Sequence, residues 1–120
     1  MHNQFTLHCI AWMAGAPLIK EVRAAACKAG LMGPAEAQQD ELDERCRHAL
    51  AISKDGYAIA CARLTPSGKV ERMAVFPGAQ CMQIESALTE LLSDYARESV
   101  PSDQKIAASL KRSQQLRKAA

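Results

Sequence analysis

The stretch that decides the fold covers residues 47–75 and reads RHALAISKDGYAIACARLTPSGKVERMAV. It opens with a short apolar run over residues 48–53, and the pair Asp55-Gly56 follows that run. An Asp-Gly pair between two apolar runs is a strong β-hairpin signal, because both central residues of the turn can adopt positive φ. We therefore expect residues 48–53 to form a strand that turns back against the next run.

The next run and a second turn extend this hairpin into a meander. Residues 57–64 form the second arm, and alternation places four of its side chains on one face: Tyr57, Ile59, Cys61 and Arg63. Residues 65–68, Thr-Pro-Ser-Gly, have turn composition, and residues 69–76 supply a further strand. The stretch therefore predicts three consecutive antiparallel strands.

Ahead of the meander, the sequence predicts one strand and one helix. Apolar residues alternate with others over residues 5–11, which is typical of a strand of mixed burial. Gly15 and Pro17 then interrupt the chain. From Leu18 the apolar positions follow helical spacing, and Gly30 is expected to be the C-cap of this helix.

Beyond the meander, a long helix is expected over residues 82–98. Its apolar stripe recurs at spacings of four, three and four residues: Ile84, Leu88, Leu91 and Tyr95. Pro101 ends this helix. Residues 105–110 fit either a strand or the start of a terminal helix that runs towards Arg117.

Composition and charge limit the classes of function. The chain has 120 residues, 48% of them apolar, and a net charge of +2, which fits one globular domain over residues 1–120. The acidic segment within residues 33–44 is too hydrophilic for the core and is expected to be partly helical. Basic residues gather towards the other end: Lys105, Lys111, Arg112, Arg117 and Lys118. No aromatic residue is interleaved with them for base stacking, so nucleic-acid binding stays a minor alternative.

The cysteines and the apolar segments indicate a reduced, cytoplasmic protein. The five cysteines are odd in number and widely spaced, with neither a CxxC pair nor a paired Cys/His spacing, so we expect no metal site and no disulfide framework. Cys61 falls where a small hydrophobic residue is expected. Residues 5–13 are apolar but too short to span a bilayer, and no basic region precedes them. Membrane insertion and export are therefore not expected.

The order of elements, with these residues, resembles the GNAT superfamily of acetyl-CoA-dependent N-acyltransferases. Residues 47–75 resemble the central meander of the family, with an Asp-Gly turn, a strand ending in Ala-Arg-Leu, a Gly-Lys turn and an Arg-x-Ala-Val strand. Upstream, EVRAAACKAGL is similar to the first helix of a subgroup with an Arg-x-x-Val-Phe pattern, where Arg23 matches and Ala26 and Cys27 replace the bulky pair. Downstream, AVFPGAQCMQIESALTELLSDYA has the length and apolar pattern of the acceptor strand, cofactor loop and long helix.

The resemblance covers roughly residues 18–97 and implies a fold and a ligand. The implied fold is α/β (α+β), a GNAT-like acyl-CoA N-acyltransferase fold in which helices flank a mixed, mostly antiparallel sheet, here without its C-terminal part. The implied cofactor is acetyl-CoA or CoA. Backbone groups of Met73 and Val75 would pair with the pantetheine arm. A loop at a helix N-terminus would bind the pyrophosphate, and its residues here are Gln80, Cys81, Met82, Gln83 and Ile84.

The chain departs from the family pattern in this loop and after the long helix. Gln83 and Glu85 stand where the family places Gly, and Gly or Ala, so side chains enter a crowded turn. At about 5 Å, the Glu85 charge beside a pyrophosphate would cost on the order of 1–3 kcal/mol. No aromatic residue follows Tyr95, whereas the family often uses a later tyrosine as a general acid. The resemblance therefore implies a degenerate active site.

Several polar residues have a catalytic and a structural interpretation. The resemblance places Glu71 where some members carry the general base, while its position between Lys69 and Arg72 also fits an exposed strand glutamate. His48 and Cys81 could be reactive, but a hydrogen-bonded histidine and an inert loop thiol are the structural interpretations. Arg63 and Arg72 are expected to pair with the acidic segment.

Two hypotheses for function follow from these observations. The first is a GNAT-like domain, non-catalytic or weakly acyl-CoA-binding, that serves dimerisation or partner binding. The alternative is an active acetyl-CoA-dependent N-acetyltransferase acting on a small-molecule or protein amine. In either case we expect a homo-oligomer, most simply a dimer, because a shortened sheet exposes an edge that must be covered.

Overall fold

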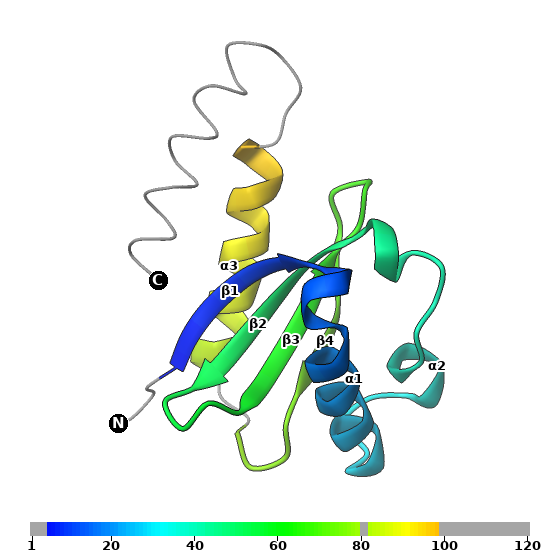
Figure 1. The fold of residues 1–120 in the computed structure, drawn as a ribbon, viewed down its shortest axis with the longest axis vertical. Coiled ribbons are helices and arrows are strands. Elements are labelled where there is room, and N and C mark those ends of the chain that lie inside the picture. The colour runs from blue at the N-terminus through cyan, green and yellow to red at the C-terminus, as the bar shows by residue number, and fades with distance from the viewer. Residues whose placement is uncertain (1–4, 80–81, 99–120) are drawn as a thin grey trace.

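The computed structural model describes residues 5–79 and 82–98, and they form an α+β domain (Figure 1). In chain order its elements are β1 (Phe5–Ala11), α1 (Trp12–Lys28), α2 (Pro34–Ala37), the 3-10 turn η1 (Asp43–Arg45), β2 (Arg47–Ser53), β3 (Ala58–Leu64), β4 (Val70–Val75) and α3 (Met82–Glu98). The predicted order of strand, helix, three-stranded meander and helix is confirmed. The predicted segment at residues 105–110, with Arg117 beyond it, lies outside the described residues.

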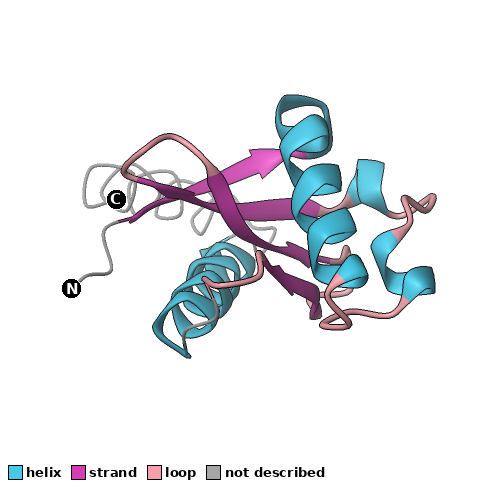
Figure 2. Cartoon of the chain, turned by 90° about the horizontal axis from the view of Figure 1, so that it is seen from below, coloured by secondary structure: helices cyan, strands magenta, loops and turns pink. Residues whose placement is uncertain are grey.

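The strands form one sheet between two helices. Their order is β1-β2-β3-β4, and each neighbouring pair is antiparallel. Helix α1 covers one face of the sheet and α3 covers the other (Figure 2). Among the described strands, β1 and β4 are the two edges. No helix within the described part of the chain combines the length and apolar character needed to cross a bilayer.

The two hairpins of the meander use the same turn. Each has three residues between the backbone pair that closes the turn, and the last of the three is a glycine with positive φ: 91° at Gly56 and 92° at Gly68. The Ser53 N–H donates to the Tyr57 carbonyl at 2.8 Å in the first turn, and the second turn has an equivalent bond. Asp55 does not use the positive φ that an Asp-Gly pair allows, because Lys54 enters the loop and only the glycine needs that conformation.

A bulge in β3 overturns the predicted common face of that strand. Ala51 pairs with Ala60 but Ile52 pairs with Ala58, so Ile59 is an extra residue in the ladder. Ile59 therefore packs with the α3 side of the sheet, whereas Cys61 is buried on the α1 side. The prediction that Cys61 packs as a small hydrophobic residue is confirmed.

Helix α1 begins at Trp12, six residues before the position that the sequence predicted. Gly15 and Pro17 lie inside it. Gly15 packs so closely against the sheet that an added Cβ would lie 2.2 Å from Ile10 Cδ1. Burial of Trp12, 4% exposed, stabilises this first stretch enough to offset the hydrogen bond lost at Pro17.

The end of α1 matches the expected glycine cap. Gly30 has φ 78°, its N–H donates to the Cys27 carbonyl, and the Leu31 N–H donates to the Ala26 carbonyl at 2.8 Å. These two bonds define a Schellman motif, which satisfies carbonyl groups that the helix leaves free.

Helix α3 packs on a floor of small side chains. Four buried alanines of the central strands face it: Ala49, Ala51, Ala60 and Ala62. Ile84, Leu88 and Leu92 of α3 lie against this floor, and the last two are 0% exposed. The predicted span of the helix is confirmed, and its buried stripe passes through Leu92 while Leu91 and Tyr95 are half-buried.

Candidate functional site

A buried ion pair joins α1 to the segment before β2. Arg23 donates from Nη1 and Nη2 to the two carboxylate oxygens of Asp43, at 2.8 and 2.9 Å. The two residues are 1% and 0% exposed. A two-pronged contact of this kind is among the strongest side-chain hydrogen bonds, and burial makes each partner depend on the other.

Arg63 of β3 is the centre of this network. Its guanidinium, 2% exposed, donates to Asp43 at 3.0 Å, to Asp40 at 2.7 Å and to Glu71 at 2.5 Å. Arg72 adds a bond to Asp40 at 3.0 Å. The prediction that Arg63 and Arg72 pair with the acidic segment is therefore confirmed.

The acidic segment is consequently part of the core at one position. The expectation that residues 33–44 are all too hydrophilic for the core is wrong for Asp43, because two arginines neutralise its charge. Further along, the Arg72 guanidinium donates to the backbone carbonyls of Glu36 and Gln38. These bonds hold the segment against β4.

His48 is a structural residue of the same network. It is fully buried, its ring centroid lies 5.2 Å from that of Trp12, and Nε2 donates to the Asp43 carbonyl at 2.9 Å. A carbonyl oxygen only accepts, so the proton is on Nε2. Burial lowers the pKa of His48 and keeps the ring neutral. The structural interpretation of this histidine is confirmed.

We expect the network to make the fold sensitive to acid. Burial acts to raise the pKa of Asp43, but the hydrogen bonds and charges of Arg23 and Arg63 outweigh it and lower that pKa to about 2. A carboxyl group whose pKa is lower in the folded state than in the unfolded state stabilises the fold at pH values above the unfolded-state pKa. This stabilisation is lost as the pH falls from about 4 to about 2. The loss should be about 2 kcal/mol, measured by urea unfolding at each pH. Asp43→Asn should show a shallower decline; an equally steep decline would contradict this origin.

Glu71, the predicted general base, accepts hydrogen bonds from Arg63. The two residues are opposite each other in the β3–β4 ladder. Oε2 of Glu71 accepts from Arg63 Nε at 2.9 Å and from Nη2 at 2.5 Å. The Glu71 side chain is half-buried, with 29% of its surface exposed. Glu71 therefore holds the guanidinium in place.

The predicted cofactor-binding residues are divided between two elements. Met73 and Val75 lie on β4, where Met73 is half-buried and Val75 is 6% exposed. Ile84 is buried in the same cluster as Val75, whereas Met82 is 83% exposed and Gln83 is exposed. Gln80 and Cys81 lie outside the described residues.

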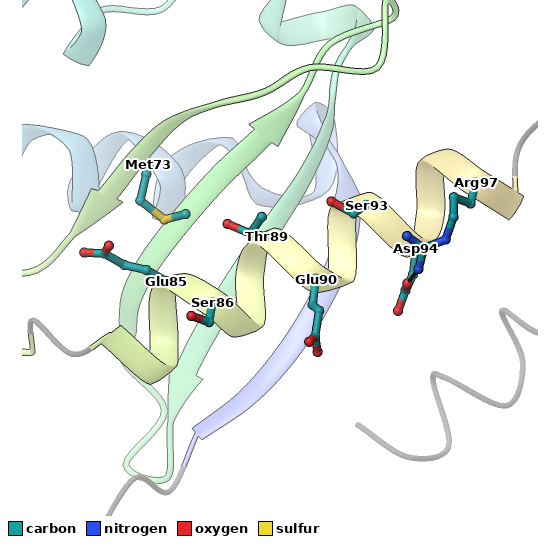
Figure 3. Close-up of a pocket in the computed structure, with 8 residues that line it drawn as sticks. All are labelled: Met73, Glu85, Ser86, Thr89, Glu90, Ser93, Asp94 and Arg97. Atoms are coloured by element: carbon teal, nitrogen blue, oxygen red, sulfur yellow. Dashed lines mark hydrogen bonds and ion pairs between the residues drawn. The ribbon is translucent and has the colours of Figure 1, made fainter.

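A cleft of about 490 Å³ lies between β4 and α3 (Figure 3). Met73 is its β4 residue, and α3 supplies the others: Glu85, Ser86, Thr89, Glu90, Ser93, Asp94 and Arg97. Arg97 forms an ion pair with Asp94. Glu85 and Glu90 are exposed and add negative charge. The cleft therefore disfavours a pyrophosphate beside Met73.

The pair of Arg23 and Asp43 was not predicted from the sequence. The signal was present, since Arg23 follows Ile19 by four residues and Val22 by one on the buried side of α1. A charged residue on such a face needs a buried partner. Across residues 5–79 and 82–98, no group of three His, Cys, Asp or Glu side chains is arranged to hold a metal.

Comparison of the chain with family models, curated proteins and solved structures finds no match.

Proposed function

We propose that this chain is a GNAT-like domain that binds a partner and does not catalyse acyl transfer. The proposal of this fold is supported by the order β1-α1-α2-β2-β3-β4-α3 and by an antiparallel meander that has α1 on one face and α3 on the other. All of these elements except β1 lie in or overlap residues 18–97, over which the sequence resembles the family.

The hydrogen bonds between Arg63 and Glu71 are the observation that supports the proposed lack of catalysis. A general base must reach the substrate with a lone pair that is free to take a proton. Both hydrogen bonds that Glu71 accepts from Arg63 end on Oε2, so this oxygen is committed to a guanidinium that is itself 2% exposed. His48, the other candidate base, is fully buried.

The outer edge of β4 is the proposed binding surface, with a second copy of the chain as the partner. An edge strand offers unpaired backbone groups, and two identical edges can pair about a twofold axis. Sedimentation equilibrium should detect a dimer. Met73→Lys should shift it to monomer, because a lysine on an edge opposes strand pairing, whereas Thr6→Lys on β1 should leave it unchanged. A natural chain that is monomeric at every concentration would contradict this proposal.

The alternative, an active acetyl-CoA-dependent N-acetyltransferase, is favoured by the course of β4. This edge strand leads directly towards α3, and Met73 lines the cleft between them. That is the place where the resemblance puts the pantetheine arm.

Calorimetric titration with acetyl-CoA and free CoA separates the two proposals. We expect a Kd above about 1 mM for the natural chain, because Glu85 lies in the first turn of α3 and repels a pyrophosphate. The double variant Gln83→Gly/Glu85→Gly, which restores the small residues, should bind more tightly. Micromolar binding by the natural chain would contradict the non-catalytic proposal.

A further inference from the structure

A second cleft, of about 540 Å³, lies at the other end of α3. Three segments that are distant in sequence converge on it: the start of β2, the β3–β4 turn and the last turns of α3. Its polar and aromatic lining comprises Glu44, Arg45, Arg47, Thr65, Ser67 and Tyr95. Since Met82 and Tyr95 are at opposite ends of the helix, this cleft is separate from the proposed acyl-CoA loop.

The arginines of this cleft differ from the other arginines that the structure describes. Arg23, Arg63, Arg72 and Arg97 all pair with carboxylates. Within residues 5–79 and 82–98, Arg45 and Arg47 form no ion pair, and both line this cleft. Two guanidiniums are thus left to receive an anion from outside the described part of the chain.

Arg47 is held in place although it has no carboxylate partner. Its guanidinium carbon lies 5.1 Å from the centroid of the Tyr95 ring, within the range of a cation–π contact. Its Nε is buried and has no hydrogen-bond partner in the described structure. A guanidinium fixed by an aromatic ring loses little freedom when it binds an oxyanion.

The β3–β4 turn adds a hydroxyl donor. Thr65 Oγ1 accepts the Lys69 N–H at 3.1 Å and lies 2.9 Å from Ser67 Oγ. The Thr65 hydroxyl can therefore donate its hydrogen bond to Ser67 Oγ, and the Ser67 O–H is then left to donate a hydrogen bond to a ligand.

We propose that this cleft binds the phosphoryl group of a small phosphate monoester. Guanidinium and hydroxyl groups are the donors that phosphate oxygens take, and arginine matches them with two parallel bonds. The volume falls within the range of small-molecule pockets. Glu44 is the opposing charge, so the two arginines leave the lining with a net positive charge. The basic residues beyond position 98 have the wrong sign to occupy it.

Titration of the full chain with glycerol 3-phosphate tests this site, with NMR detection of the arginine Nε–H signals. The Arg47 Nε–H signal should shift and saturate, and glycerol at the same concentration should leave it unchanged. Arg45→Gln should raise the Kd at least tenfold, whereas Glu44→Gln should lower it severalfold. Lys54→Gln is the matched control, since it removes one exposed positive charge in the β2–β3 turn and should change the Kd less than twofold.

Two results would overturn the proposal. The first is an Arg47 signal that does not move as glycerol 3-phosphate is raised from 10-fold the protein concentration to about 20 mM. Even weak anion sites respond at that concentration. The second is equal weakening by Lys54→Gln and Arg45→Gln, which would show general charge attraction. Arg47→Lys keeps the charge and should still weaken binding, followed through the Arg45 Nε–H signal, so the test does not depend on a variant that loses the charge near Tyr95.

Discussion

Replacement of Asp43 with alanine is expected to lower the free energy of unfolding by about 3–5 kcal/mol. The substitution removes the only carboxylate that the described structure places on Arg23, and it leaves that buried guanidinium without a charge partner. It also removes one of the three carboxylates on Arg63. Urea unfolding followed by circular dichroism should show a lower midpoint at nearly constant slope.

Asp40→Ala is the matched control for this prediction. Asp40 also bonds Arg63, but its side chain is 33% exposed, so water can replace much of the contact and the loss should be about 1 kcal/mol. The double variant Arg23→Met/Asp43→Leu should recover part of the stability, because it removes both buried charges. If Asp43→Ala cost no more than Asp40→Ala, the buried pair would not be the main link between α1 and the acidic segment.

Local patterns in the sequence predicted the elements but not how they meet. The meander followed from alternation and from glycine turns, and α3 followed from its helical spacing. The start of α1 was missed because Gly15 reads locally as a breaker, whereas its lack of a side chain allows the helix to approach Ile10. The bulge at Ile59 was missed because two chains must be aligned before an extra residue becomes visible.

The contacts of the candidate site also could not be predicted from local patterns, because they join segments that are distant in the sequence. The sequence placed Glu71 on a strand, but only strand register brings it opposite Arg63. The pairing of arginines with the acidic segment was predictable from charge, since a run of carboxylates without bases needs cations elsewhere. The identity of the buried carboxylate was not predictable, because the burial of Asp43 requires α1, η1 and β3 to converge.

Leu88→Ala should be the second large effect, with a loss of about 3–5 kcal/mol in the free energy of unfolding. Leu88 is 0% exposed in the middle of α3 and faces the alanine floor of β2 and β3. The cost of a large-to-small substitution depends on how far the surroundings collapse into the cavity. Alanine side chains have no rotamers to extend into it, so most of the cavity should persist. Thermal and urea unfolding of the variant measure this loss.

Leu91→Ala is the comparison that separates the cavity from the loss of helix packing in general. Leu91 is half-buried in the same helix, so its truncation opens to solvent and should cost about 1–2 kcal/mol. A dry cavity under Leu88 should also bind a small apolar molecule such as benzene, which would raise the melting temperature of Leu88→Ala and not that of Leu91→Ala. Equal losses for the two variants, without any effect of benzene, would mean that α3 settles onto the alanine floor. The helix would then be adjustable on the sheet, and the cleft beside Met73 would change its width with it.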